Sequence, residues 1–154
     1  MVERFEEFNR NITEAYKCIL KIKAIEMQKY GLRGANVMCL FFLGKHPEGL
    51  TPSQLCTLCG EDKAGVSKSL AALKKSGYVS TEGMGRKYRM LYKITQNGIA
   101  VYKKLTDCID GVVAKVGDGL SDEERDTFYA ALDSIVSNLQ AYTATYAADK
   151  TEEL

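Results

Sequence analysis

Apolar residues recur every three or four positions along most of this 154-residue chain, which predicts a mainly helical protein. The first repeat predicts a long helix that runs to about Tyr30 and is ended by Gly31. Its apolar positions are Phe5, Phe8, Ile12, Ala15, Ile19 and Ile22. Residues 33–45 are apolar almost all round, which is typical of a buried helix.

A short helix is predicted to begin directly after Thr51. Thr51 and Gln54 have the spacing of a capping box, and Pro52 occupies the first helical position, where its missing N–H has no partner to lose. Gly60 ends this helix, because glycine adopts the left-handed conformation readily. The positions expected to face inward are Leu55, Cys56 and Cys59.

A second short helix follows, with Asp62 as its N-cap and an end near Ser76. Its apolar stripe consists of Val66, Leu70 and Leu73. The outward face of this helix carries small and hydrogen-bonding residues together with cations. Such a face would let the helix backbone enter a major groove of DNA. The predicted DNA contacts of this recognition helix are Lys63, Ala64, Gly65, Ser67, Lys68, Ser69 and Lys74, with Ser53 and Gln54 of the preceding helix beside them.

The pattern then changes from helical spacing to the alternation of a β-hairpin. Strand-forming residues at 78–81 precede Gly83 and Gly85, which allow a turn. On the return strand the residues expected on the core face are Tyr88, Met90, Tyr92 and Ile94. The hairpin tip would project as a wing, and its candidate DNA contacts are Arg86, Lys87 and Arg89.

Two further helices are predicted after the hairpin. Thr95 caps the first, and Ser121 with Glu124 forms a capping box for the second. The last helix carries a heptad seam, at Phe128, Leu132, Ile135, Leu139, Tyr142 and Tyr146. Such a narrow seam on a terminal helix favours a partner helix, with packing on its own chain as the alternative. Residues 148–154 are expected to fray.

Charge is strongly partitioned, although the net charge is only +1. Residues 62–95 contain eight Lys and Arg against two acids, whereas residues 118–154 contain two against nine acids. One part of the chain therefore suits a polyanion and another repels it. The positive cluster in residues 62–95 lies beside a capped pair of helices. This combination favours DNA binding over the alternative that the cations merely solvate a hairpin.

Several other functions are excluded or disfavoured by the composition. The sequence has no apolar run near the roughly 20 residues of a membrane span and no signal-peptide core, so we expect a cytoplasmic protein. Neither a Ser/His/Asp set nor a phosphate-binding glycine loop occurs, and the single histidine, His46, leaves no zinc ligand set. We therefore expect no enzyme, metal or cofactor.

The five cysteines are too scattered for a disulfide framework. The Cys56-x-x-Cys59 pair is interpreted as core packing rather than as a metal or redox site, since it lacks a second ligand pair. Cys18, Cys39 and Cys108 are likewise interpreted as reduced core residues in helices.

The order of elements resembles the MarR family of bacterial transcriptional regulators along essentially the whole chain. The matching residues are Leu55, Asp62-Lys63 with Val66 and Ser67, Leu73 with Gly77, and Ile94-Thr95 with Gly98. The resemblance implies a mainly α fold with a small β-hairpin wing. It also implies an N-terminal dimerisation helix (1–31), a winged helix-turn-helix (32–95), C-terminal dimerisation helices (96–147) and a tail (148–154).

The resemblance further implies a homodimer that binds a pseudo-palindromic double-stranded DNA operator as a repressor. The expected dimer-interface residues are Phe5, Phe8, Ile12, Phe128, Leu132, Ile135, Leu139 and Tyr142. Many members release DNA when a small aromatic or lipophilic effector, or an oxidant, binds. The wing departs from the family, since the stretch 85–88 has no acid to orient an arginine.

Two alternatives to this function stay open. The first is a winged-helix protein–protein adaptor that does not bind DNA, which the retained positive cluster disfavours. The second is a cysteine-based redox sensor, for which the resemblance points to Cys18 in the first helix. Only Lys17 and Lys21 lie close enough in sequence to lower the pKa of that thiol.

Overall fold

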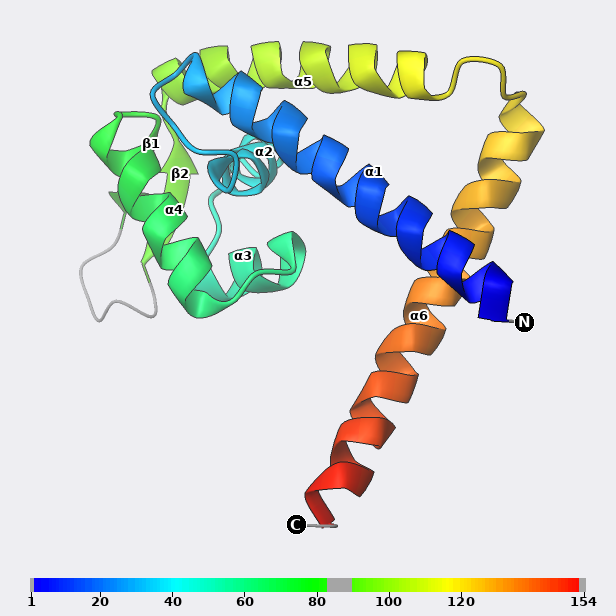
Figure 1. The fold of residues 1–154 in the computed structure, drawn as a ribbon. Coiled ribbons are helices and arrows are strands. Elements are labelled where there is room, and N and C mark those ends of the chain that lie inside the picture. Colours follow the sequence, from blue (N-terminus) through cyan, green and yellow to red (C-terminus); the bar gives the residue numbers. More distant parts are fainter. Residues whose placement is uncertain (1, 83–89, 153–154) are drawn as a thin grey trace. The chain divides into compact units, whose positions relative to one another are not determined.

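The computed structural model describes residues 2–82 and 90–152, and within them it is mainly helical with one small antiparallel sheet (Figure 1). The elements are α1 (Val2–Gln28), α2 (Asn36–Lys45), α3 (Pro52–Cys59), α4 (Lys63–Lys75), β1 (Val79–Glu82), β2 (Leu91–Ile94), α5 (Gln96–Val116) and α6 (Asp122–Glu152). This confirms the predicted fold class. The chain divides into two compact units, Met1–Ile109 and Asp110–Leu154.

The caps predicted for α3 and α4 are present. The Thr51 hydroxyl accepts a hydrogen bond from the Gln54 backbone N–H at 3.3 Å, and the Gln54 side chain accepts one from the Thr51 N–H at 2.9 Å. Gly60 ends α3 in the left-handed conformation, with φ of 64°. Asp62 then accepts a hydrogen bond of 2.7 Å from the Gly65 N–H at the start of α4. Local hydrogen bonds thus define where the two short helices end and begin on either side of a tight turn.

The core of the first unit lies where α2, α3, α4, the hairpin and the first half of α5 meet. Its most buried large side chains are Met27, Leu40, Leu43, Leu55, Leu70 and Leu73. Cys56, Cys59, Tyr92 and Ile94 pack against this core while partly exposed, as their positions in the pattern predicted. Burial of this cluster fixes the orientation of α4, whose opposite face remains in solvent.

The hairpin at the base of the predicted wing is well defined. Val79 pairs with Ile94 and Glu82 pairs with Leu91. Leu50 adds a further bridge, since its N–H and C=O both bond to Tyr92, at 3.0 and 2.9 Å. This bridge could not be predicted from the sequence, because a single bridging residue has no periodicity to detect. It attaches the hairpin to the segment that leads into α3.

Thr95 joins the start of α5 to the turn after α4. Its hydroxyl donates a hydrogen bond to the Gly77 carbonyl at 2.7 Å and accepts one from the Gly98 N–H at 3.1 Å. A Cβ atom at Gly98 would lie 2.1 Å from the Tyr78 carbonyl oxygen, so only glycine allows this close approach. The end of α4, the start of the hairpin and the start of α5 therefore form one connected junction.

We expect Thr95→Val to lower the free energy of unfolding by about 1 kcal/mol, because it removes a cap and a hydrogen bond between elements while keeping the side-chain shape. Denaturant unfolding followed by circular dichroism measures the change. Thr106→Val on the same helix is the matched control, since the Thr106 hydroxyl bonds only to the Lys103 carbonyl of its own helix. Equal losses in the two variants would show that the Thr95 junction contributes nothing.

The second unit begins in the last turns of α5 and continues into α6. The predicted capping box is present, with Ser121 N–H donating to Glu124 Oε2 at 2.8 Å and Glu124 N–H donating to the Ser121 hydroxyl at 3.3 Å. The Arg125 guanidinium donates to the carbonyls of Gly117 and Leu120, at 3.1 and 3.0 Å. Arg125 thereby satisfies backbone oxygens in the turn between the helices, a role that its sequence position did not reveal.

Two expectations about element ends and burial are wrong. The second helix begins at Asn36 rather than at residue 33, because the Asn36 side chain accepts a hydrogen bond from the Arg33 N–H and closes a turn there. Cys18 is exposed in the chain and is not a core residue.

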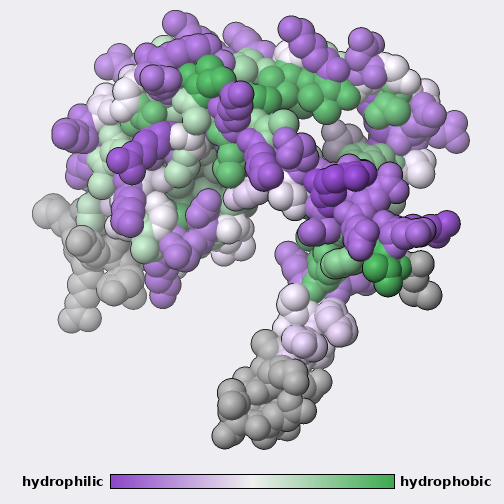
Figure 2. Space-filling model, in the orientation of Figure 1, coloured by the Kyte–Doolittle hydropathy of each residue, from purple (hydrophilic) through white to green (hydrophobic). Residues whose placement is uncertain are grey.

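Much apolar surface is exposed on the long helices of both units. The seam of α6 leaves Phe128 55%, Leu139 47% and Tyr142 64% exposed, and α1 exposes Phe5 and Ile12. Hydrophobic surface is also visible along α5 in the space-filling view (Figure 2). No helix in the described part of the chain is long and apolar enough to cross a membrane.

Candidate nucleic-acid interface

The solvent face of α4 is the most distinctive surface of the first unit. Because Val66, Leu70 and Leu73 anchor one side of the helix, the opposite side is exposed along its length. The predicted residues on this face are Lys63, Ala64, Ser67, Lys68 and Lys74, and all five are exposed. Ala71 and Lys75 are exposed on the same face and were missed by the prediction, although a helical projection of the sequence would have found them.

Ser69 was expected on this face, and that placement is wrong. Ser69 is 4% exposed, and its hydroxyl donates a hydrogen bond to the Ala35 carbonyl at 3.3 Å. Position 69 follows Val66 by three residues and precedes Leu73 by four, so it falls on the buried stripe. Gly65 is only partly exposed, at the border between the two faces.

Two lysines of this region are held by neighbouring side chains. Lys74 Nζ lies 3.0 Å from the Thr81 hydroxyl, which connects α4 to β1. Lys93 forms an ion pair with Glu82 across the hairpin, with 2.7 Å between Nζ and Oε2. Lys74 therefore connects the hairpin to α4, whereas Lys93 joins the two strands of the hairpin to each other.

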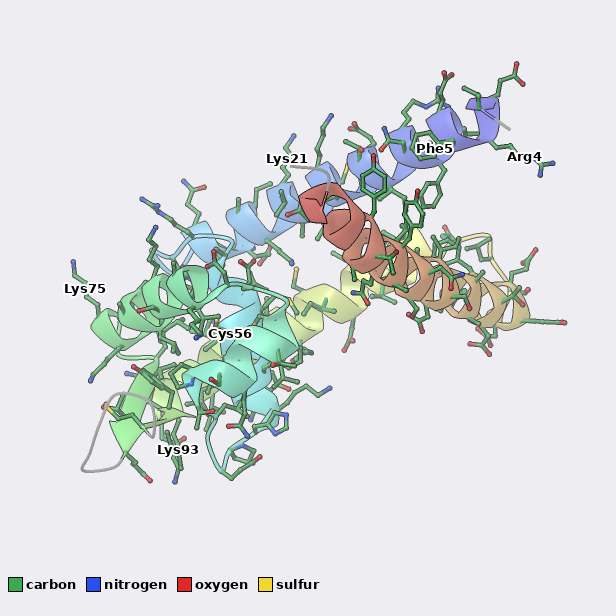
Figure 3. The ribbon with its side chains drawn as sticks, turned by 90° about the horizontal axis from the view of Figure 1, so that it is seen from below. Arg4, Phe5, Lys21, Cys56, Lys75 and Lys93 are labelled. Carbon is green, nitrogen blue, oxygen red and sulfur yellow. The ribbon has the colours of Figure 1, made fainter. Side chains whose placement is uncertain are left out.

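The other lysines of α4 extend into solvent. Within the described residues, no carboxylate forms an ion pair with Lys63, Lys68 or Lys75. Figure 3 shows Lys75 projecting from α4 and Lys93 at the hairpin on the same side of the unit. Small side chains at Ala64, Ser67 and Ala71 lie among these cations, so a polyanion could approach the helix backbone closely.

The candidate residues on α3 are exposed beside the turn. Ser53 and Gln54 occupy the first turn of that helix. Gln54 Oε1 is engaged in the capping box, accepting from the Thr51 N–H and hydroxyl. Its amide group therefore retains N–H donors suited to an anionic acceptor such as a phosphate.

The wing candidates Arg86, Lys87 and Arg89 lie outside the described residues. The strands that lead to them are described, and their register is fixed by the pairing of Glu82 with Leu91.

A hollow of about 360 Å³ lies between the segment before α2 and the side of α4. It is lined by Gly31, Leu32, Arg33, Ala35, Asn36, Gly65, Lys68, Ser69 and Ala72. Apolar atoms form most of the lining, and Arg33 and Lys68 contribute two cations at its edge. Such a lining suits a small molecule that is both apolar and anionic.

Comparison with protein families gives a match to the family model described as MarR family, over residues 30–87. The matched segment contains α2, α3, α4 and β1. A comparison with curated protein sequences found no match.

Solved structures with the same fold cover most of the chain. A MarR protein from Peptoclostridium difficile has a TM-score of 0.78 at 20% identity, covering 87% of this chain and 88% of its own. Staphylococcus aureus MarR in complex with salicylate and kanamycin has a TM-score of 0.78 at 17% identity, covering 90% and 94%. A Staphylococcus aureus MepR–DNA complex has a TM-score of 0.73 at 20% identity, covering 88% and 96%.

The structural likeness establishes the fold, and the sequence match establishes the relationship in the segment that carries α3 and α4. Residues 30–87 are thus similar to the MarR family, and most of the chain shares the fold of solved MarR structures.

Proposed function

We propose that the protein is a sequence-specific double-stranded DNA-binding regulator that acts as a repressor. The observation that carries this proposal is the exposed face of α4, where small side chains alternate with lysines that no described acid pairs with. A helix with this surface fits a major groove, which is wide enough to admit it. The MepR–DNA complex, which has the same fold, supports the proposal.

In this proposal the contacts divide into two kinds. Ser67 and Lys68, near the middle of the exposed face, reach base edges and read sequence. Lys63, Lys75 and the wing residues Arg86, Lys87 and Arg89 neutralise phosphates and set the orientation of the protein. Ser53 and Gln54 at the start of α3 contact the backbone. Ser69 is removed from the contact set because it is buried.

The functional unit in this proposal is a homodimer. The apolar residues exposed on α1 and on the seam of α6 support it, because a soluble chain rarely leaves such residues in water without a partner. A symmetric dimer presents two copies of α4 and therefore matches a pseudo-palindromic operator.

A winged-helix adaptor that binds only protein is the competing function. Incubating the immobilised protein with fragmented genomic DNA and sequencing the bound fraction separates the two. The proposal predicts enrichment of fragments that share a two-fold related motif. Recovery of fragments in proportion to their abundance, at a salt concentration where the protein remains folded and dimeric, would favour the adaptor.

We also propose that a small aromatic or lipophilic effector releases the DNA. The hollow beside α4 supports this, because a ligand that contacts Lys68 there competes directly with DNA for the same side chain. The salicylate complex of Staphylococcus aureus MarR indicates that this fold accommodates aromatic acids.

We expect an aromatic carboxylate such as salicylate to raise the melting temperature and weaken DNA binding, because it binds one state of the protein preferentially. Titration calorimetry and DNA-binding curves measure the two effects. Arg33→Ala should abolish both if the hollow is the site, whereas Arg4→Ala on α1 is a matched control. If a broad set of aromatic acids and lipophilic phenols changes neither quantity, regulation by such effectors is ruled out.

A further inference from the structure

The sulfur atoms of Cys39 and Cys59 lie 3.8 Å apart where α2 packs on α3. Cys39 is 1% exposed in the middle of α2, and Cys59 is the partly exposed last residue of α3. Both thiols are free. A disulfide requires about 2.05 Å between the sulfurs, so closing the bond needs rotation of the side chains and a shift of the end of α3 toward α2.

The two thiols differ in a way that suits stepwise oxidation. The hydrogen-bond contact with Cys59, together with burial, raises the pKa of the Cys39 thiol. The same hydrogen bond lowers the pKa of Cys59, and the positive charge of Lys23 adds to that effect, whereas burial and Glu61 oppose it. Cys59 is also the more accessible of the two sulfurs, so it is the one that an oxidant reaches first.

The position of Cys59 links this pair to the DNA-reading helix. Only residues 60–62 separate it from the first residue of α4. That turn has little freedom, since the N–H groups of Gly60 and Glu61 both bond to the Cys56 carbonyl and Asp62 caps α4. A shift of the end of α3 toward α2 is therefore transmitted to the start of α4.

We propose that a hydroperoxide oxidises Cys39 and Cys59 to an intramolecular disulfide, which displaces the start of α4 and weakens DNA binding. The regulatory consequence rests on the proposed function, whereas formation of the bond does not. The pair differs from the Cys56-x-x-Cys59 spacing visible in the sequence, because the partner of Cys59 comes from another helix.

The chemistry balances in two steps. The Cys59 thiolate attacks the terminal oxygen of the hydroperoxide and becomes a sulfenic acid, while the O–O bond breaks and the leaving alkoxide takes a proton from solvent. The Cys39 sulfur then attacks the Cys59 sulfur, and its proton leaves with the hydroxyl group as water. Two thiols have lost two hydrogens, and the peroxide has accepted two electrons.

The test begins with reduced, full-length protein treated with stepwise equivalents of hydrogen peroxide. Peptide mapping identifies any cross-link, and DNA binding is measured on the same samples with a duplex selected from genomic fragments. We expect a Cys39–Cys59 cross-link and a fall in affinity of about five- to a hundredfold, the usual range for coupling between sites, which dithiothreitol reverses. Cys59→Ser and Cys39→Ala should each prevent both changes, whereas Cys56→Ser and Cys18→Ser should keep them.

The outcomes are separable. Oxidation of other cysteines without a Cys39–Cys59 cross-link would overturn the inference, and a cross-link that leaves affinity unchanged would overturn its regulatory part. If the reduced protein selects no DNA, the proposed function fails and the regulatory part fails with it, while the peptide map still decides whether the bond forms.

Discussion

Leu139→Asp should convert the protein from a dimer to a monomer at micromolar concentration. Leu139 lies in the middle of the α6 seam and is 47% exposed in the single chain. If a partner copy covers the seam, each dimer of the variant buries two unpaired carboxylates, at a cost of roughly 3–5 kcal/mol. That cost raises the dissociation constant of the dimer by roughly a hundred- to a few-thousandfold. Sedimentation velocity over a concentration series measures the change.

Ser137→Asp is the matched control for this variant. Ser137 is exposed on α6 and lies two residues before Leu139, on the opposite side of the helix. It adds the same charge without entering the seam, so it should remain dimeric. A Leu139→Asp protein that sediments as the parent dimer would mean that the seam packs within its own chain.

Ser67→Ala and Lys68→Ala should each weaken binding to the cognate operator by about 1–3 kcal/mol and relax sequence preference. Both side chains lie in the exposed middle of α4, one turn beyond the Asp62 cap. Binding curves on the operator and on single-base variants measure both effects. Lys17→Ala is the control, because it removes an exposed lysine on α1 of the same unit. It should leave the DNA sequence preference unchanged.

Substitutions in the wing should have a different signature. Replacing Arg86, Lys87 or Arg89 with alanine should weaken binding to all DNA sequences similarly. It should also reduce, by about one, the slope of the logarithm of the binding constant against the logarithm of the salt concentration. Titrations at several salt concentrations on a specific and a scrambled duplex test this. Loss of specificity in the wing variants, with only general weakening in the Ser67 and Lys68 variants, would reverse the two assignments.

Local signals in the sequence were sufficient to predict most of the DNA-reading unit. Caps and helix stops depend on a few neighbouring residues, so Thr51, Gly60 and Asp62 revealed α3 and the start of α4 correctly. The apolar stripe of α4 likewise fixed which face is buried. The polarity of Ser69 indicates an exposed position, whereas its place on that stripe indicates the buried position that the structure shows.

Contacts between distant residues could not be predicted in this way. The bridge from Leu50 to Tyr92 and the approach of Cys39 to Cys59 join segments whose separation in space the sequence pattern does not specify. The spacing of Cys56 and Cys59 is visible in the sequence, whereas the 3.8 Å approach of Cys39 to Cys59 joins two different helices and has no local signal. Cys18 was expected inside because its helix is amphipathic, yet the apolar face of α1 is largely exposed in the single chain.

The central claim is that α4 reads a specific DNA sequence, and the ratio of two dissociation constants tests it most directly. The reduced, unsubstituted protein is titrated onto the motif enriched from genomic fragments and onto a scrambled duplex of the same length and composition, both at physiological salt. A sequence-specific regulator should bind the enriched motif at least about a thousandfold more tightly. Equal dissociation constants on the two duplexes would contradict the claim.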